Sequence, residues 1–367
     1  MPLRRCGSEG RAGVRRGFAA AAAALALVLA CNGASSGEER QRPRHYWEQP
    51  GGDGSVWNRP LGRGAIWGDA NDPDTQDLRH GGIINPANDL GHTVWVGRRN
   101  DPIFFLTGDP RVGNARAIVR LHLPAEVYAP GPHPGDNNAV YFDPVGHWGL
   151  VFSSGNPTVI HGRRITGGLT ETDDATSDSF GEDQETGLMG HSTAAGLIRR
   201  YDLEQIERGG HMRHMLRYAT DAKYLKDASV DGVQKLGPKS WPQAYEDYQE
   251  PGVNLYTGRL AAGTTIGIPI TTPMPPGLTR GGQELFWTLQ HYGALFRDQA
   301  GGGVHFCVDQ ESDGSDIVAG MRRDLPMIVQ LLAPLRNQHV GGRPFATSPK
   351  NGPGRRVDTG PPPLARR

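Results

Sequence analysis

The feature that most constrains the fold is the density of turn-forming residues, with 52 glycines and 29 prolines in a chain of 367 residues. From His45 to about Val340 these residues, together with Asn and Asp, break the sequence into short apolar runs. Short runs between turn clusters are typical of β-strands. A long coiled coil and a polytopic membrane protein are excluded, because both need long uninterrupted helices.

The spacing of the apolar runs predicts about ten strands, which suit an all-β or α+β domain built like a β-sandwich or jelly roll. The predicted strands are His92–Gly97, Ile103–Thr107, Arg116–Leu123, Ala139–Asp143, Trp148–Ser153, Thr158–Thr166, Met212–Ala219, Thr264–Ile270, Ala294–Asp298 and Val304–Val308. Helical periodicity occurs at Leu203–Arg208, Gln283–Tyr292 and about Asp324–Leu335, and we expect these short helices at the sheet edges. No internal repeat is found, which argues against a propeller or a solenoid.

The N-terminal region has the features of an export signal. Residues 1–30 combine a basic start with an apolar stretch that is too short to span a bilayer, which predicts a signal peptide. The stretch ends Val28-Leu29-Ala30-Cys31, which resembles the bacterial lipobox, so Cys31 is the predicted lipidation site and mature N-terminus. The alternative is an ordinary secretory signal that ends close to a cysteine. Arg15 and Arg16 also fit a twin-arginine signal, so the export route stays open.

The rest of the chain divides by composition. Residues 31–44 form a polar tether, residues 45–340 a single β-rich domain, and residues 341–367 a Gly/Pro/Arg tail that we expect to be disordered. The prediction is an exported bacterial lipoprotein of the outer membrane or cell surface, whose lipid anchor is its membrane contact. Because 39 basic and 39 acidic residues balance, a broad basic face is not expected, and neither is a nucleic-acid partner.

Three blocks of sequence resemble a group of exported bacterial proteins. The first is Ser55-Val56-Trp57-Asn58-Arg59-Pro60-Leu61, which is similar to that group's Ser-x-Trp-Asn-x-Pro-[Ile/Leu] opening. The second runs from Ala194-Ala195-Gly196-Leu197 through Tyr201-Asp202 to His211–Tyr218, and the third is Leu289–Asp298. The group is largely uncharacterised and loosely associated with polysaccharide-active enzymes, so the resemblance implies the β-rich fold more than a particular reaction, with an extracellular polysaccharide as the expected substrate. The chain departs from the group at Glu171–Gly190, where an acidic loop replaces a Trp/Ser/Gly-rich stretch.

The matched blocks supply candidates for an elimination reaction. A polysaccharide lyase needs a base, an acid for the departing oxygen and a cation that neutralises the uronate carboxylate. His214, Arg217, Tyr292 and Asp298 carry those groups, and we interpret them as candidate catalytic residues. The alternative for His214 is a hydrogen-bonded core residue, because the predicted strand places it on one face with Met212 and Leu216.

Carboxylates at strand ends offer a second chemistry. Asp143, Asp298 and Asp309 each end a predicted strand, where carboxylates usually cap turns. Two of them facing each other across a cleft would instead form the acid and the base of a glycosidase, so Asp143 joins the catalytic candidates. Elimination and hydrolysis both stay open. A non-catalytic carbohydrate-binding or envelope-interaction lipoprotein is the alternative to an enzyme.

Aromatic side chains are candidate platforms for sugar rings. Trp57, Trp67, Trp95, Trp148 and Tyr141 have the required flat apolar surface, and core filling is the alternative for each. The residues predicted to bind substrate are Trp57, Asn58, Trp148 and His191.

Two acidic stretches bear on metal binding. Glu171–Glu185 contains seven acids and is expected to be a solvated loop. The stretch Asp69-x-Asn71-Asp72-x-Asp74-x-x-Asp77 spaces oxygen ligands as a hard cation requires, but it lacks the central Gly and terminal Glu of an EF-hand. We therefore expect no cofactor, with calcium as the alternative. Motifs for serine hydrolases, nucleotide binding, zinc proteases and thiol redox chemistry are missing from the sequence.

Overall fold

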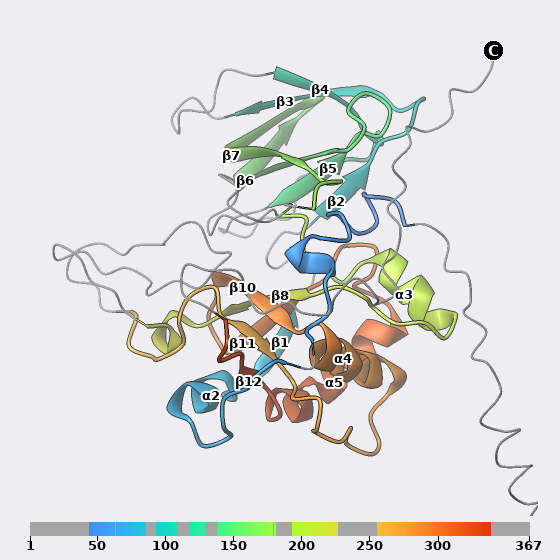
Figure 1. Cartoon of the computed structure of the whole chain (residues 1–367). Coiled ribbons are helices and arrows are strands. Elements are labelled where there is room, and N and C mark those ends of the chain that lie inside the picture. Colours follow the sequence, from blue (N-terminus) through green and yellow to red (C-terminus); the bar gives the residue numbers. More distant parts are fainter. Residues whose placement is uncertain are drawn as a thin grey trace, which may run out of the picture. The chain divides into compact units, whose positions relative to one another are not determined.

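The structure is a computed structural model, and it describes residues 44–62, 64–85, 93–108, 118–128, 138–178, 180, 193–226 and 255–338. Strands predominate in these ranges and are arranged in two mixed sheets with a few short helices, which is compatible with the predicted all-β or α+β class (Figure 1). The described residues from Arg44 onward belong to one compact unit. The predicted signal peptide, most of the tether including Cys31, and the predicted tail lie outside the described residues.

One sheet, which we call the helix-covered sheet, is formed by the C-terminal half of the chain plus one early strand. Its order is β1-β11-β8-β10-β9-β12. The bounds are β1 Gly82–Asn85, β11 Val304–Cys307, β8 Leu216–Thr220, β10 Ala294–Gln299, β9 Thr265–Gly267 and β12 Ala333–Pro334. Strands β8 and β10 pair in parallel, while β11 pairs with β8 antiparallel, so the sheet is mixed at its centre.

The other sheet, which we call the hairpin sheet, is formed by residues between Thr93 and Asp174. Its order is β2-β5-β6-β7-β3-β4. The bounds are β2 Thr93–Val96, β5 Ala139–Phe142, β6 Leu150–His161, β7 Arg164–Asp174, β3 Ile103–Gly108 and β4 Ile118–His122. The long antiparallel hairpin β6–β7 is its centre, and Gly162 makes the turn with a φ of 58°.

Helices α4 (Arg280–His291) and α5 (Asp316–Val329) lie beside the helix-covered sheet (Figure 1). Each begins at a side-chain cap, because Thr279 accepts from the backbone of Gly282 and Ser315 from that of Val318. The two helices approach closely, since a Cβ added at Gly281 would lie 2.0 Å from the carbonyl oxygen of Ile317. The apolar sides of both helices share one core with the sheet, including Leu285, Phe286, Met321, Leu325, Leu216, Tyr218, Phe296 and Phe306.

A second core joins residues of both sheets. Val140 and Phe142 of β5 and Val151 of β6 pack in one cluster with Leu295 and Cys307 of the helix-covered sheet and with Met215, which directly precedes β8. Tyr46 and Trp57 belong to the same cluster. Trp57 belongs to the short 3-10 helix η1 (Val56–Asn58) and is only 1% exposed. The segment that starts the described chain therefore contributes to the core between the sheets.

Two predicted elements were placed wrongly, and one α-helix was not predicted. Helix α5 begins at Asp316 rather than Asp324, because Ser315 caps it and Val318 and Met321 extend the apolar stripe ahead of Leu325. The predicted strand Thr158–Thr166 contains a turn in the structure, where β6 ends and β7 begins. The acidic stretch from Asp69 to Asp77 includes the unpredicted helix α2, Pro73–Leu78, which starts with proline after Asp72. Helix α3 (Arg200–Glu207) lies at the predicted position, shifted by a few residues.

Candidate functional site

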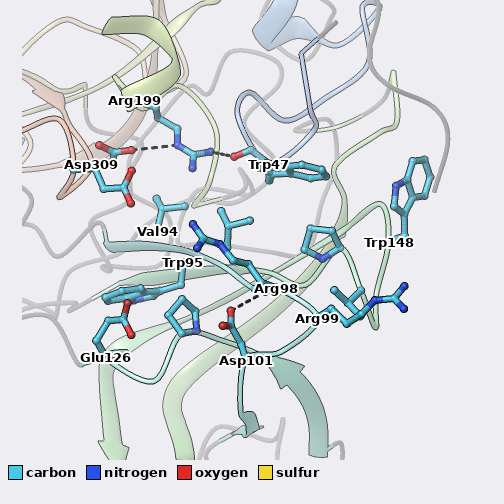
Figure 2. Close-up of a pocket in the computed structure, with 16 residues that line it drawn as sticks. Trp47, Val94, Trp95, Arg98, Arg99, Asp101, Glu126, Trp148, Arg199 and Asp309 are labelled. Carbon is cyan, nitrogen blue, oxygen red and sulfur yellow. Dashed lines mark hydrogen bonds and ion pairs between the residues drawn. The ribbon is translucent and has the colours of Figure 1, made fainter. Parts of the chain in front are cut away.

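The described residues form a groove with a volume of about 1030 Å³ (Figure 2). We call it the tryptophan groove, because Trp47, Trp95 and Trp148 line it. Five short segments supply the rest of its wall. They are Val94 to Asp101 from β2 and the turn after it, Pro124 and Glu126 after β4, Pro144 and Val145 in the β5–β6 turn, and Arg199, Asp309 and Glu311.

The tryptophan rings are held by neighbouring aromatic rings. Trp47 stacks on His45 at a centroid distance of 4.2 Å, and Tyr46 contacts Trp148 edge to face at 5.6 Å. Trp47 and Trp148 are half-buried, so part of each indole surface faces the groove (Figure 2). Trp95 is 8% exposed and packs edge to face against the exposed ring of Tyr128. Flat apolar surfaces fixed in this way can receive the C–H faces of sugar rings.

Charged side chains of both signs surround these rings. Arg98, Arg99, Glu126 and Glu311 are exposed, and Asp101 accepts a hydrogen bond of 2.7 Å from the backbone of Arg98, which closes the turn after β2 (Figure 2). Because these groups face solvent, their charges are available to a ligand. The groove thus combines apolar platforms with hydrogen-bonding groups, as small-molecule and glycan sites do.

Asp309 is the buried carboxyl group of the groove. It follows β11, is 3% exposed, and lies 3.4 Å from Arg199 Nε through Oδ2. Its Oδ1 accepts from the backbone of Ser312 at 2.9 Å. Burial raises the pKa of Asp309 above its ordinary value, while the Arg199 charge acts in the opposite direction. A carboxyl group that keeps its proton to higher pH is suited to general-acid catalysis.

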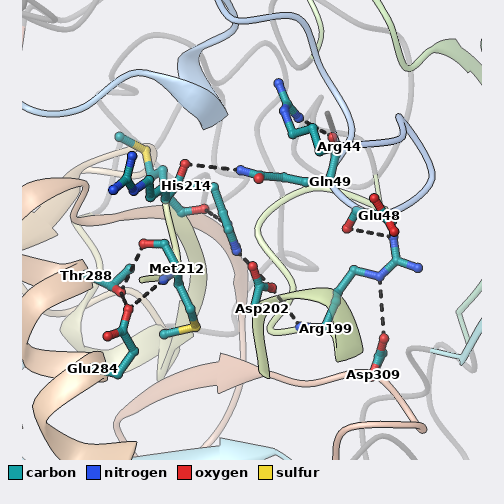
Figure 3. A network of polar contacts seen from close by, with 12 residues as sticks. Arg44, Glu48, Gln49, Arg199, Asp202, Met212, His214, Glu284, Thr288 and Asp309 are labelled. Carbon is teal, nitrogen blue, oxygen red and sulfur yellow. Dashed lines mark hydrogen bonds and ion pairs between the residues drawn. The ribbon is translucent and has the colours of Figure 1, made fainter. Parts of the chain in front are cut away.

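Arg199 connects the groove to a buried polar network (Figure 3). Its Nη1 donates to the carbonyl oxygens of Trp47 and Glu48, and its backbone nitrogen donates to Asp202 Oδ2 at 2.9 Å. The same Asp202 oxygen lies 3.2 Å from His214 Nε2, and His214 Nδ1 lies 3.0 Å from the carbonyl oxygen of Met215. The network therefore fixes the guanidinium that pairs with Asp309.

The predicted catalytic residue His214 lies inside this network and not in the groove. It is 2% exposed, and the cavity beside it, also lined by Trp57 and Asn58, has a volume of only about 10 Å³. That volume is at the lower limit for one water molecule. A sugar does not reach His214 in this conformation, and its contacts are those of a hydrogen-bonded core residue.

Arg217, Tyr292 and Asp298 lie on or next to the helix-covered sheet. Arg217 is fully buried, and burial lowers its pKa to about 10. Asp298 accepts a hydrogen bond from Arg297 Nη1 at 2.8 Å. Its negative charge also acts to raise the pKa of Arg217, so the structure brings the predicted residues Arg217 and Asp298 close together. Tyr292 follows α4 as its C-terminal cap residue and is 8% exposed. These three residues are not among those that line the tryptophan groove.

The predicted catalytic residue Asp143 is fully buried and caps a turn. Its carboxylate accepts from the backbone nitrogens of His122, Val145 and Gly146 at 2.8, 3.1 and 2.9 Å, and lies 3.0 Å from His122 Nδ1. This turn carries Val145 and Trp148 to the groove. Asp143 thus positions the wall of the groove.

Among the predicted substrate-binding residues, Trp148 lines the groove. Trp57 is buried in the core between the sheets. Asn58 donates from Nδ2 to the carbonyl oxygens of Pro50, Gly51 and Gly52 at 3.0, 2.8 and 3.0 Å, and so ties the loop that precedes it. His191 lies outside the described residues. Trp47, Arg98, Arg99, Glu126 and Glu311 are among the groove residues that were not predicted. The Arg98-Arg99 pair directly after a predicted strand was the available signal.

Metal binding has little support where the chain is described. No group of three His, Cys, Asp or Glu side chains is placed to hold an ion in those ranges. In the candidate calcium stretch, Asp72 and Asp74 both bind Arg336, whose Nη2 lies 2.7 Å from each carboxylate. The hydrogen bond from Arg336 lowers the pKa of Asp72. None of the helices in the described ranges has the length and apolar character needed to cross a bilayer.

The function of this protein has to be argued from the geometry of the site, because comparisons with known proteins found no match. The chain matches no family model, no curated protein and no solved structure.

Proposed function

We propose that the protein acts on an extracellular polysaccharide in the tryptophan groove. The observation that carries this proposal is the presence of three tryptophans and several carboxyl groups around one space of about 1030 Å³. That volume accommodates a few sugar units, because ligand pockets for small molecules span about 300 to 1,000 Å³. The resemblance to exported bacterial proteins associated with polysaccharides points to the same substrate class.

Hydrolysis is the reaction that this groove supports best. Its lining contains Asp309, whose raised pKa suits a general acid, and the exposed carboxylates Glu126 and Glu311, either of which could activate water or attack the sugar. Elimination has less support, because the base, cation and acid assigned to it, His214, Arg217 and Tyr292, are buried outside the groove.

Non-catalytic carbohydrate binding is the second candidate. The ion pair between Asp309 and Arg199 favours this candidate, because it occupies the groove carboxyl group whose pKa suits proton transfer. Stacking on the tryptophans is then the main interaction that the groove offers to a glycan. In that case the protein binds an envelope or environmental polysaccharide and releases it unchanged.

A panel of neutral and acidic polysaccharides tests these readings. Hydrolysis yields new reducing ends without near-ultraviolet absorbance, whereas elimination creates a C4–C5 double bond that absorbs. Asp309→Asn should lower hydrolytic turnover by roughly 10²-fold or more, because general acids contribute about that much. Trp148→Ala should weaken glycan binding, while Trp287→Ala, which alters a ring stacked between His211 and His291 outside the groove, should not.

Each outcome of the panel selects one reading. Binding without any product, with loss of binding in Trp148→Ala, favours the non-catalytic protein. Absorbing products would favour elimination and return attention to His214 and Arg217. The polysaccharide proposal fails if no glycan binds, or if Trp287→Ala and Trp148→Ala change binding equally.

We also propose that the two sheets form a sandwich-like frame. Support comes from the cluster in which Val140 and Phe142 of one sheet pack with Leu295 and Cys307 of the other. Side chains from two inner faces interdigitate in this way in sandwiches.

The proposed location is the bacterial cell envelope, with Cys31 lipidated. The motif Val28-Leu29-Ala30-Cys31 after a short apolar stretch is its basis. Cys31→Ala should release the protein from the membrane fraction or leave it unprocessed, whereas Cys6→Ala, in the predicted signal peptide, should fractionate like the wild type. Identical fractionation of wild type and Cys31→Ala would refute the lipid anchor.

A further inference from the structure

Arg217 lies on the face of the helix-covered sheet that is opposite to its two helices. Its neighbours in β8, Leu216 and Tyr218, belong to the core under α4 and α5. Because side chains alternate along a strand, Arg217 points the other way, toward the side that holds Leu295 and Cys307. The guanidinium is fully buried there and does not line the tryptophan groove.

One edge of this guanidinium has no hydrogen-bond partner among the described residues, although the Cys307 side chain lies near Arg217. Nη1 donates to the carbonyl oxygen of Thr193 at 2.6 Å. Nε and Nη2 are buried and have no hydrogen-bond acceptor within the described structure. These two nitrogens carry parallel N–H bonds on the same edge of the planar group, which is the fork that receives a carboxylate through two hydrogen bonds.

A second buried guanidinium lies close by. Arg297 of β10 is 6% exposed, donates from Nη1 to Asp298 at 2.8 Å, and donates from Nη2 to Thr193 Oγ1 at 3.3 Å. Its Nε is likewise buried without an acceptor within the described ranges. The charge of Arg297 acts with burial to lower the pKa of Arg217 to about 10, so the two cations are near enough to repel each other.

In the part of the chain that the structure describes, the carboxylate of Asp298 pairs with Arg297, and the charge of one of the two buried cations is left to be balanced. An uncompensated buried charge is costly, and so is each buried N–H group without an acceptor. Thr193, which both arginines contact, contributes neutral oxygen atoms and removes no charge. The arrangement becomes favourable when an anion with two acceptor atoms occupies the free edge.

We propose that Arg217 and Arg297 form a binding site for the carboxylate of a small organic acid, separate from the tryptophan groove. The two carboxylate oxygens accept from Nε and Nη2 of Arg217, and the net charge of the ligand compensates the second guanidinium. A planar group with two oxygens matches the fork, whereas a spherical chloride ion accepts at one point. Because both arginines are buried, the proposed ligand is a small acid rather than a long acidic chain.

Acetate is the probe for this site. The melting temperature of the full-length protein is measured at constant pH and ionic strength while sodium acetate replaces sodium chloride, and acetate affinity is then measured by calorimetry. We expect acetate to stabilise the protein more than chloride, with saturation, because a ligand that binds only the folded state stabilises it. Arg217→Lys keeps the charge but removes the fork, so acetate affinity should fall about tenfold or more.

Two further variants keep the test decisive. Arg163→Lys, in the β6–β7 turn, makes the same change at an exposed site outside the tryptophan groove and should leave acetate binding unchanged. Cys307→Ser tests an internal counter-ion, since the Cys307 side chain lies within hydrogen-bonding reach of Arg217. The proposal predicts that Cys307→Ser still binds acetate with wild-type affinity.

The proposal is overturned by equal effects of acetate and chloride on the wild type. It is also overturned if a folded Arg217→Lys retains wild-type affinity, or if acetate binds only after Cys307→Ser, which would show that the Cys307 side chain itself occupies the fork. If Arg217→Lys does not fold, the ranking of acetate over chloride in the wild type decides the question. Failure here leaves the glycan proposal untouched, because its test uses different residues.

Discussion

Buried ionisable side chains differ in whether their contacts leave a proton or a charge available. His214 and Asp202 are hydrogen-bonded to each other and to backbone atoms. Asp143 accepts hydrogen bonds from three backbone nitrogens and contacts the imidazole of His122. Asp309 pairs with Arg199 at 3.4 Å and still borders the tryptophan groove. The first two arrangements stabilise structure, whereas the third places a titratable group at a ligand site.

The raised pKa of Asp309 predicts a pH-dependent stability. The folded protein holds this proton more tightly than the unfolded chain, whose aspartate pKa is about 3.9. As pH rises from that value through the raised folded pKa, the folded state binds more protons than the unfolded one, and the free energy of unfolding decreases. Asp309→Asn removes this titration, so the wild-type advantage over the variant should shrink across that window.

Denaturant unfolding of both proteins at several pH values measures the difference. Glu311→Gln is the matched control, because Glu311 borders the same groove but is exposed. Its stability curve should run parallel to that of the wild type. A parallel curve for Asp309→Asn as well would contradict the raised pKa.

His214→Ala should destabilise the protein and leave glycan binding intact. The substitution leaves the carboxylate of Asp202, which is 1% exposed, without its imidazole, and a buried group left unsatisfied costs roughly 1–3 kcal/mol. Urea unfolding measures this loss, and binding to the best polysaccharide of the panel is measured on the folded variant. His161→Ala, at an exposed position, should change stability by less than about 0.5 kcal/mol. Lost turnover with unchanged stability in His214→Ala would restore its catalytic interpretation.

The sequence showed which residue types carry chemistry but not which of them stay accessible. The contacts of His214 agree with the alternative interpretation, a hydrogen-bonded core residue. The contacts of Asp143 agree with the alternative of a turn cap. Both outcomes depend on partners distant in sequence, such as His122 for Asp143. Local pattern does not contain that information.

At the scale of elements, turn residues predicted where strands lie, whereas periodicity predicted the helices α3, α4 and α5 with starts that are too late. Nearly every predicted strand overlaps an observed one, because Gly, Pro, Asn and Asp mark the ends directly. Helix α5 was predicted to start too late, because Gly320 and Pro326 lower the helix propensity of its sequence. Gly320 is nevertheless required there, since a Cβ at this position would lie 2.6 Å from Thr279 Oγ1. Tertiary packing of α4 on α5 therefore overrides propensity.

Close approach also predicts the effect of Gly196→Ala. Gly196 has a φ of 68°, and an added Cβ would lie 2.5 Å from the backbone nitrogen of Arg217 and 2.7 Å from the Trp57 ring. Gly162 in the β6–β7 turn has a similar φ of 58° but open space around it. Gly162→Ala should thus cost about 1 kcal/mol for conformation alone, and Gly196→Ala a further 1–3 kcal/mol or so for overpacking. Equal losses in denaturant unfolding would mean that the chain around residue 196 yields without cost.

At the scale of the whole molecule, the tryptophan groove is a product of long-range packing. Its wall joins Trp47, the turn at Arg98, Trp148 and Asp309, which are separated by tens to hundreds of residues. Trp95, Trp148 and Asp309 were recognised from the sequence as candidates of the right type. Their meeting around one space depends on how strands distant in sequence come together, which composition and periodicity do not determine.

The Gln310 side chain links the two sheets and gives a prediction for their cooperativity. Its Oε1 accepts from the backbone nitrogen of Val94 at 2.7 Å, and its Nε2 donates to the Val94 carbonyl at 2.6 Å, so a residue following β11 binds the backbone of β2. Gln310→Ala should lower the free energy of opening in β2 and β5 more than in β8 and β10, measured by native-state hydrogen exchange. Gln290→Ala is the matched control, because its amide also makes two backbone hydrogen bonds, to Pro269 and Thr272, but within the helix-covered half. If Gln310→Ala lowers protection equally in both sheets, they unfold as one unit through their shared core, and Gln310 adds stability without controlling the coupling.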